Sequence, residues 1–114
     1  MTDYDILSYN NLMNLINRKI LEQFKKKHAQ SVRPLIVWEN IVNQSDYKSF
    51  IDLRKTFPSS DYVPHYTVFN IGGNKYRLIT EIDYEYQLID IKIVWTHAEY
   101  SQKNNSEKLS RGEL

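Results

Sequence analysis

The sequence predicts an α+β fold in which the helices come first and the strands follow. Apolar residues recur at helical spacing in the first half of the chain, whereas the residues from Tyr66 onward alternate in the manner of β-strands. With 114 residues, the chain has the length of one domain. We therefore expect a short N-terminal strand and two to three helices packed on one face of a curved, mainly antiparallel sheet of about four strands.

The first predicted elements are a brief strand and a basic helix. Residues 1–12 show no clean period and are expected to be an N-terminal extension, so that the folded domain begins at Met13. Residues 14–18 contain an apolar pair and are interpreted as a short strand. Residues 19–29 are predicted to be helical, because their apolar residues gather on one side and three consecutive lysines occupy the remainder.

Two further helices are predicted before the strands. The second helix starts near Ser31 and carries an apolar stripe at 3.6-residue spacing, with Pro34 tolerated in its first turn. Ser45 or Asp46 is expected to cap a third, shorter helix. That helix ends before Pro58, because a proline disfavours helical geometry in the residue before it.

Three antiparallel strands are predicted in the second half of the chain. Residues 66–71 are rich in β-branched and aromatic side chains, and the Gly-Gly-Asn triplet at 72–74 supplies a hairpin turn. Residues 75–84 alternate strictly, and a second turn falls around residues 85–87. Residues 88–95 alternate as well. Their apolar face is predicted to consist of Ile89, Ile91, Ile93 and Trp95.

The chain ends in a polar segment, residues 101–114, whose low hydrophobicity predicts a mobile tail. No internal repeat and no second domain boundary appears in the sequence. The expected organisation is therefore an N-terminal extension over residues 1–12, one domain over residues 13–100 and the C-terminal tail.

Composition excludes several classes of protein. The chain has no cysteine, which removes disulfide frameworks, thiolate zinc sites and cysteine nucleophiles and fits a reducing, cytoplasmic environment. No apolar run approaches the ~20 residues that span a membrane, and the polar N-terminus does not resemble a secretory signal. The three histidines lack the spacing of a helical zinc site, and a strand follows the Gly-Gly-Asn triplet instead of the helix of a phosphate-binding loop. We expect no metal, no cofactor and no membrane contact.

Positive charge is distributed unevenly, although the net charge is only +1. Residues 18–33 contain six basic side chains against one acidic side chain, which is a local charge of +5. Such a segment is either a solvated helix face or a surface that binds RNA phosphates. The composition does not decide between the two.

Two basic side chains and one histidine stand out in the predicted strands. Lys75 and Arg77 lie two residues apart, so their side chains point to the same side of the sheet. Their repulsion must be offset, either by Glu81 and Asp83 on the same face or by a bound phosphate. His97 ends the last predicted strand, where a structural role and a chemical role are both open.

Three motifs carry a resemblance to a known family. They are Phe57-Pro58-Ser59 with Asp61, the pattern F-N-I-x-G-N-x-Y-R-L within residues 68–79, and Thr96-His97-Ala98-Glu99-Tyr100. In this order and spacing they resemble the HigB family of bacterial toxins, within the RelE/ParE superfamily. The resemblance covers about Met13 to Tyr100. Before Lys55 the chain matches the family in its length and in the order of its helices and strands, but not in a sequence motif.

The resemblance implies a RelE-like fold and a specific activity. Members of the family are ribosome-dependent endoribonucleases, or mRNA interferases, that cut mRNA in the ribosomal A site. The implied partners are a HigA-type antitoxin, the ribosome and mRNA, and the implied location is cytoplasmic. The expected reaction needs no metal and leaves a 2′,3′-cyclic phosphate.

The chemistry of RNA cleavage gives roles to residues of the matching motifs. The 2′-hydroxyl must lose a proton, the phosphorane's charge must be stabilised and the leaving 5′-oxygen must gain a proton. Arg77 is expected to stabilise the phosphate, His97 to act as general acid or base, and Tyr100 to stack on a base or donate a proton. The expected RNA contacts are Lys75, Lys55 and Asn70, together with Lys25, Lys26 and Lys27 on the basic helix.

One position departs from the family pattern, since Ser101 stands where members usually carry an aspartate. Two other functions therefore stay open. One is a non-catalytic module of the same fold that binds RNA or an antitoxin, and the other is a ParE-like inhibitor of DNA gyrase. The T-H-x-E-Y ending favours the HigB branch. The helices around Trp38 and the edge of the sheet are the candidate surfaces for an antitoxin.

Overall fold

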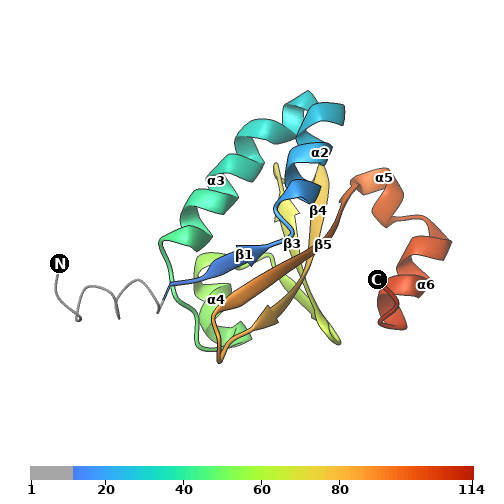
Figure 1. Ribbon diagram of the computed structural model, residues 1–114. Helices are drawn as coiled ribbons and strands as arrows, with labels where there is room; N and C mark the ends of the chain where they lie inside the picture. The colour runs from blue at the N-terminus through green and yellow to red at the C-terminus, as the bar shows by residue number, and fades with distance from the viewer. Residues whose placement is uncertain (1–11) are drawn as a thin grey trace, which may run out of the picture.

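The computed structural model describes residues 12–114, which form the predicted α+β fold (Figure 1). The strands are β1 (Asn14–Ile16), β2 (Asp61–Val63), β3 (Tyr66–Ile71), β4 (Tyr76–Asp83) and β5 (Leu88–Thr96). The helical elements are α2 (Lys19–Lys27), the 3₁₀ turn η1 (Ala29–Ser31), α3 (Val32–Asn43), α4 (Phe50–Thr56), α5 (His97–Tyr100) and α6 (Lys103–Ser110). The predicted extension over residues 1–12 lies outside the described residues, apart from Leu12.

The strands form one five-stranded sheet in the order β1-β5-β4-β3-β2. Strand β1 runs parallel to β5, and the remaining neighbours are antiparallel, so the sheet is mainly antiparallel as predicted. The fifth strand is β2, which was not expected from the sequence. It has three residues, two of them exposed, and a segment this short shows no alternation that a pattern search could detect.

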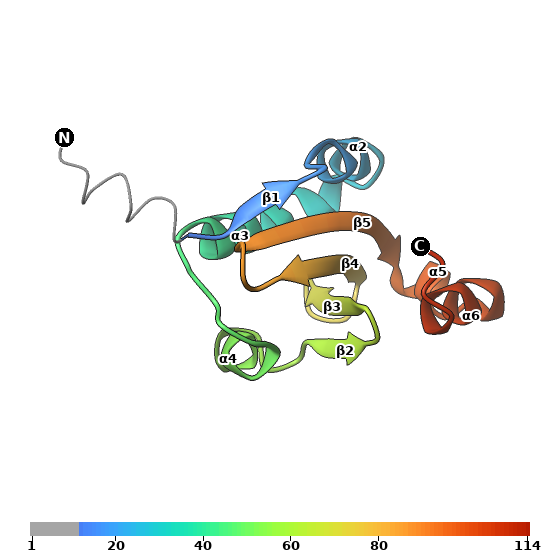
Figure 2. The ribbon, with the colours of Figure 1, turned by 60° about the horizontal axis from the view of Figure 1, so that its bottom comes forward.

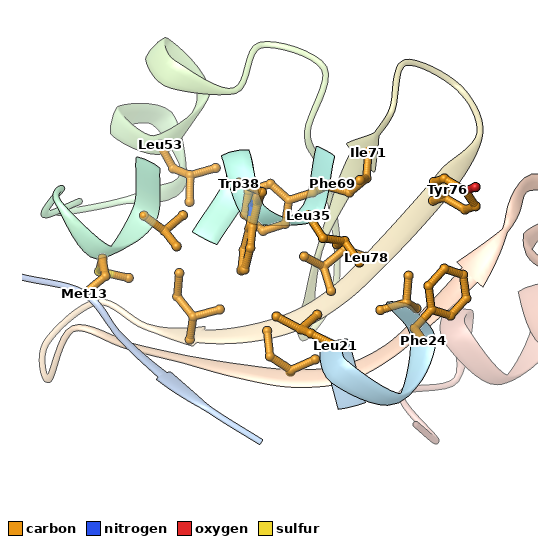
Figure 3. Packing of buried hydrophobic residues seen from close by; sticks show 14 of the residues in the cluster. Met13, Leu21, Phe24, Leu35, Trp38, Leu53, Phe69, Ile71, Tyr76 and Leu78 are labelled. Atoms are coloured by element: carbon orange, nitrogen blue, oxygen red, sulfur yellow. The ribbon is translucent and has the colours of Figure 1, made fainter. Parts of the chain in front are cut away.

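Helices α2, α3 and α4 pack against one face of the sheet, as expected (Figure 2). Their apolar stripes and the facing strand residues form the main hydrophobic core (Figure 3). Aromatic rings meet edge to face in this core, with the Trp38 and Phe69 centroids 5.2 Å apart and those of Phe57 and Phe69 5.1 Å apart. The buried residues at its centre include Leu21, Phe24, Leu35, Trp38, Leu53, Phe69 and Leu78.

The start of α4 differs from the prediction. Ser49 caps this helix, because its hydroxyl accepts the Asp52 backbone N–H at 3.1 Å. Ser45, one of the two predicted caps, instead donates its hydroxyl to the carbonyl of Ile41 at 2.6 Å, at the end of α3. The other predicted cap, Asp46, precedes the true cap by three residues. The predicted cap was wrong because the side chain of Ser45 belongs to the helix before it.

A bulge in β5 changes which side chains face the main core. The pairing of β4 with β5 shifts its register between Ile79 and Thr80, which leaves Lys92 as an extra residue in β5. Before the bulge, Ile91 faces the main core, whereas after it Trp95 faces the opposite side of the sheet. The single apolar face predicted for residues 88–95 was therefore wrong. The bulge directs the end of β5 toward the face that carries Arg77, its neighbour across β4.

Helix α6 covers part of this second face. The segment 101–114 was expected to be a mobile tail, but it forms a helix whose Leu109 is only 4% exposed and packs with Tyr66 and Trp95. The Tyr66 hydroxyl also accepts the backbone N–H of Leu114 at 2.8 Å. The sequence did not predict this packing, because Leu109 and Leu114 are the two large apolar residues of the segment and do not form a periodic pattern. Within residues 12–114, no helix is long and apolar enough to cross a membrane.

Candidate active site

Arg77 lies at the start of β4, on the face of the sheet opposite the main core, and is almost completely buried, with 8% of it exposed. Its cross-strand neighbours are Asn70 on β3 and Trp95 on β5. The guanidinium donates through Nη1 to the carbonyls of Asn74, at 3.2 Å, and Tyr76, at 3.1 Å. Through Nη2 it donates to the side-chain oxygen of Asn74. All three acceptors are neutral.

No carboxylate in the described part of the chain forms an ion pair with Arg77. A buried charge without a counterion is unfavourable, and a bound anion is one way to offset it. The planar guanidinium matches the oxygens of a phosphate in particular. The predicted compensation by Glu81 and Asp83 is therefore not found, although both acids lie further along the same strand.

His97 lies beside Arg77 because β5 passes directly into α5 at this point. Thr96 and Glu99 form a capping box, in which each side chain accepts the other residue's backbone N–H, and this fixes the first turn of the helix. The His97 backbone N–H also donates to the carbonyl of Lys75 at 2.8 Å. These contacts bring His97 Nδ1 to 3.4 Å from Arg77 Nη2, while the imidazole stays exposed.

The position of the Arg77 guanidinium fixes the tautomer of a neutral His97. Arginine nitrogens only donate hydrogen bonds, so Nδ1, which faces Arg77, must act as the acceptor. In the neutral ring the proton is then on Nε2. In this tautomer the exposed histidine can donate a hydrogen bond from Nε2–H to a substrate.

Tyr100 completes the cluster from the last residue of α5. Its ring centroid lies 5.2 Å from Arg77 Cζ and 6.3 Å from the ring centroid of Trp95. The structure thus brings together the three residues proposed to be catalytic. Ser101, at the position where the family pattern has an acid, donates its hydroxyl to the His97 carbonyl at 2.9 Å. In this chain the side chain at position 101 is therefore hydrogen-bonded to the backbone of α5.

The predicted RNA contacts near the site do not all lie together. Asn70 is exposed and pairs across the sheet with Arg77. Lys75 is exposed as well, but it lies in the turn before β4 and not in the strand, with its Nζ 3.5 Å from Gln30 Oε1. Lys55 lies on α4, which packs on the opposite face of the sheet. The structure therefore separates Lys55 from the Arg77 cluster.

The three lysines of the basic helix also differ from one another. Lys25 donates to Glu39 at 2.8 Å and to Glu22 at 2.9 Å, and its side chain is only 10% exposed. Burial lowers the pKa of Lys25, but the hydrogen bonds and charges of Glu39 and Glu22 outweigh burial, so the pKa lies above the usual 10.5. Lys26 and Lys27 are exposed. The local positive charge predicted for this segment is therefore partly neutralised by a structural ion pair.

Four residues that support the site, Thr96, Glu99, Asn74 and Asn105, were not predicted from the sequence to do so. The capping box of Thr96 and Glu99 had a visible signal, since T-x-x-E is the usual pattern at a helix N-terminus. Asn74 was assigned to the hairpin turn, and nothing in the sequence indicates that it contacts Arg77. Asn105 on α6 donates to the Glu99 carbonyl at 2.8 Å and so supports α5 from outside.

Comparison with known proteins identifies the class to which this fold and site belong. Residues 31–103 match the model of the HigB toxin family, described as the RelE-like toxic component of a toxin-antitoxin system. The chain therefore belongs to the HigB toxin family, which confirms the resemblance seen in the motifs.

Individual relatives agree with this assignment. The mRNA interferase toxin HigB of Escherichia coli K12 is 34% identical over 91 residues, which are 77% of this chain and 88% of the relative. The mRNA interferase HigB of Shigella flexneri matches to the same extent. A second mRNA interferase HigB, from Escherichia coli O6:H1, is 25% identical over 93 residues, covering 79% of this chain and 90% of the relative.

Proposed function

We propose that this toxin cuts mRNA in the ribosomal A site and that Arg77, His97 and Tyr100 carry the reaction. Family membership makes the chain the toxic component of a toxin-antitoxin system and an mRNA interferase, which is an endoribonuclease. The predicted class of enzyme is thereby confirmed. The dependence on the ribosome, the residues and the reaction sequence are our proposals.

The proposal rests on the burial of Arg77 and on its lack of a carboxylate partner among the described residues. A buried guanidinium that has only neutral hydrogen-bond partners, at 3.4 Å from an exposed histidine, forms a site for an anion next to a proton donor. Cleavage of RNA by its own 2′-hydroxyl is favoured by this combination, because negative charge develops on the phosphorane while the leaving oxygen needs a proton.

The reaction begins when the 2′-hydroxyl transfers its proton to a solvent water and its oxygen forms a bond to the adjacent phosphorus. Arg77 stabilises the charge on the non-bridging oxygens of the phosphorane. The bond from phosphorus to the 5′-oxygen then breaks, and His97, which enters this step as the imidazolium, donates its Nε2 proton to that oxygen and is left as the neutral imidazole. The products are a 2′,3′-cyclic phosphate and a free 5′-hydroxyl. In this proposal Tyr100 stacks on a base beside the scissile phosphate.

The partners follow from the same proposal. In this proposal the ribosome presents the mRNA, and Lys26 and Lys27 on α2, which are exposed, contact ribosomal RNA. Lys75 and Asn70, next to Arg77, contact the mRNA backbone. A toxin of this family is neutralised by an antitoxin, for which we propose a HigA-type protein. We propose a cytoplasmic location, because the substrate is translating mRNA.

The experiment is to incubate the protein with a labelled mRNA, either naked or bound to programmed ribosomes, and to map the fragment ends. We expect cuts within A-site codons only when ribosomes are present, with 2′,3′-cyclic phosphate ends. An mRNA with a single 2′-deoxy nucleotide at the cut position should resist cleavage there. Equal cleavage of naked mRNA would contradict the ribosome dependence, and cleavage of the 2′-deoxy position would contradict the mechanism.

If no fragment appears with folded, antitoxin-free protein, the enzyme proposal fails. Binding of the same ribosomes without cleavage would then support the non-catalytic module. Inhibition of DNA gyrase supercoiling by the same preparation would support the ParE-like function.

A further inference from the structure

The turn between β3 and β4 contacts both groups to which we assign the chemistry. Gly72 and Gly73 have φ angles of +63° and +68°, which an L side chain rarely adopts, and they direct the chain back toward β4. Asn74 follows them and accepts two of the hydrogen bonds of Arg77, one at its side-chain oxygen and one at its carbonyl. The next carbonyl, that of Lys75, accepts the His97 backbone N–H.

We infer that Asn74 is a positioning residue of the cleavage site, which acts by holding the guanidinium of Arg77 in the orientation that a phosphate needs. The inference rests on the function proposed above. Asn74 is exposed in the turn, so its side chain is not required to fill the core. The hydrogen bond that its side chain accepts comes from Arg77 Nη2, the same nitrogen that lies 3.4 Å from His97 Nδ1.

An amide is suited to this task because it orients a cation without neutralising it. An arginine side chain has several rotatable bonds, and leaving it free would add an entropic penalty each time a phosphate binds. A carboxylate at position 74 would also hold the guanidinium, but it would cancel the charge that the phosphorane requires. The neutral oxygen of Asn74 fixes the geometry and leaves the positive charge for the substrate.

Asn74→Ala is the first test, with Asn40→Ala as the matched control on the exposed side of α3. In single-turnover cleavage of programmed mRNA, we expect Asn74→Ala to lower the cleavage rate by about ten- to a hundredfold and to leave the affinity for ribosomes unchanged. Asn40→Ala should cleave like wild type. A weaker affinity with an unchanged rate would overturn the inference, since Asn74 would then bind RNA directly.

A double-mutant cycle separates positioning from a general loss of structure. If Asn74 acts through Arg77, then adding Asn74→Ala to an Arg77→Ala protein should change the residual rate by less than twofold. An additive loss, equal to that seen in the wild-type background, would show that Asn74 acts independently of Arg77 and would overturn the inference.

A measurement on the free protein keeps this inference separate from the proposed activity. The Nη signals of Arg77 in ¹⁵N NMR should be resolved in wild type and averaged by rotation in Asn74→Ala. Asn74→Asp should keep these signals resolved, yet cleave at least tenfold more slowly than wild type. If wild type does not cleave, the proposed function fails while the NMR result still tests the contact. Unchanged signals in Asn74→Ala, or wild-type cleavage by Asn74→Asp, would contradict the inference.

Discussion

Two buried cations show how individual residues in this molecule serve different purposes. Lys25 is surrounded by carboxylates, with Glu39 and Glu22 both within 2.9 Å. Arg77 is buried to a similar degree but has only carbonyl and amide oxygens as partners. A buried charge with an ion-pair partner is compensated within the fold, and removing that partner is costly, whereas a charge that is held in place but not neutralised remains available for a ligand. The contrast gives Lys25 a structural ion pair and supports our proposal that Arg77 binds the substrate phosphate.

The ion pair of Lys25 should be measurable in the stability of the protein. Glu39→Gln removes the charge of a carboxylate that is 5% exposed, and it leaves Lys25 buried with a weaker partner. We expect the free energy of unfolding to fall by about 2 kcal/mol, measured by urea denaturation at neutral pH. Asn40→Gln, at an exposed neighbouring position, should leave it unchanged. An equal effect of both variants would contradict the structural role of this pair.

The same pair predicts a dependence of stability on alkaline pH. The pKa of Lys25 is raised above 10.5 in the folded protein, so folding favours the protonated amine. The resulting stability is fully present below pH 10.5 and is lost as the pH rises through the pKa of the folded state. Wild type should therefore lose more stability than Glu39→Gln between pH 10 and the pKa of the folded state. If the free energy of unfolding falls equally with pH in the two proteins, the Lys25–Glu39 pair is not the cause of the alkaline loss of stability.

An anion should bind the free protein through Arg77. Inorganic phosphate should raise the melting temperature of wild type more than chloride does at equal ionic strength, because it binds the folded state alone. Arg77→Met should lose this difference, since it removes the charge and keeps an apolar side chain of similar length. Thermal unfolding of the two proteins in both salts is the measurement. A phosphate effect that survives in Arg77→Met would place the anion elsewhere.

At the scale of the elements, long periodic segments were predicted well and short or weakly patterned ones were not. Helices α2 and α3 and strands β3, β4 and β5 all carry repeated apolar positions, so the sequence determines their type. Strand β2 is too short to show a period, and the bulge at Lys92 is set by pairing with β4. Helix α6 depends on tertiary contacts of Leu109 that no local pattern reveals.

Leu109 tests whether α6 belongs to the folded domain. Its side chain is buried against Tyr66 and Trp95, so Leu109→Ala should lower the free energy of unfolding by about 2–3 kcal/mol. The exposed Lys108→Ala on the same helix should change it by less than about 0.5 kcal/mol. Chemical denaturation of both variants gives the comparison. If Leu109→Ala is as stable as wild type, the segment is a mobile tail after all.

The cap of α4 is a second test at this scale. Ser49→Ala removes the acceptor for the Asp52 backbone N–H and should lower the free energy of unfolding by about 1 kcal/mol. Asp46→Ala, at one of the two positions that the sequence suggested as the cap, should have no such effect. The two variants can be compared by thermal unfolding. A larger loss in Asp46→Ala would move the helix start toward the predicted position.

At the scale of the whole molecule, the sheet separates two regions with different tasks. Helices α2, α3 and α4 build the main core on one face, and the proposed site lies with α5 on the other (Figures 1 and 2). The motifs singled out Arg77, His97 and Tyr100, and the structure brings these three residues together, while their catalytic roles stay a prediction. The sequence did not predict that Lys55 would lie away from them, because only the folded arrangement assigns each helix to a face.

The site is the central claim, and the cleavage of programmed mRNA by four proteins tests it most directly. Wild type, Arg77→Ala, His97→Ala and Arg54→Ala would be compared under single-turnover conditions. Arg54 is the matched control, since it is an exposed arginine on α4, which packs on the opposite face. We expect Arg77→Ala and His97→Ala each to lower the rate by about 10²-fold or more, with Arg54→Ala unchanged. Wild-type rates in both site variants would contradict the account.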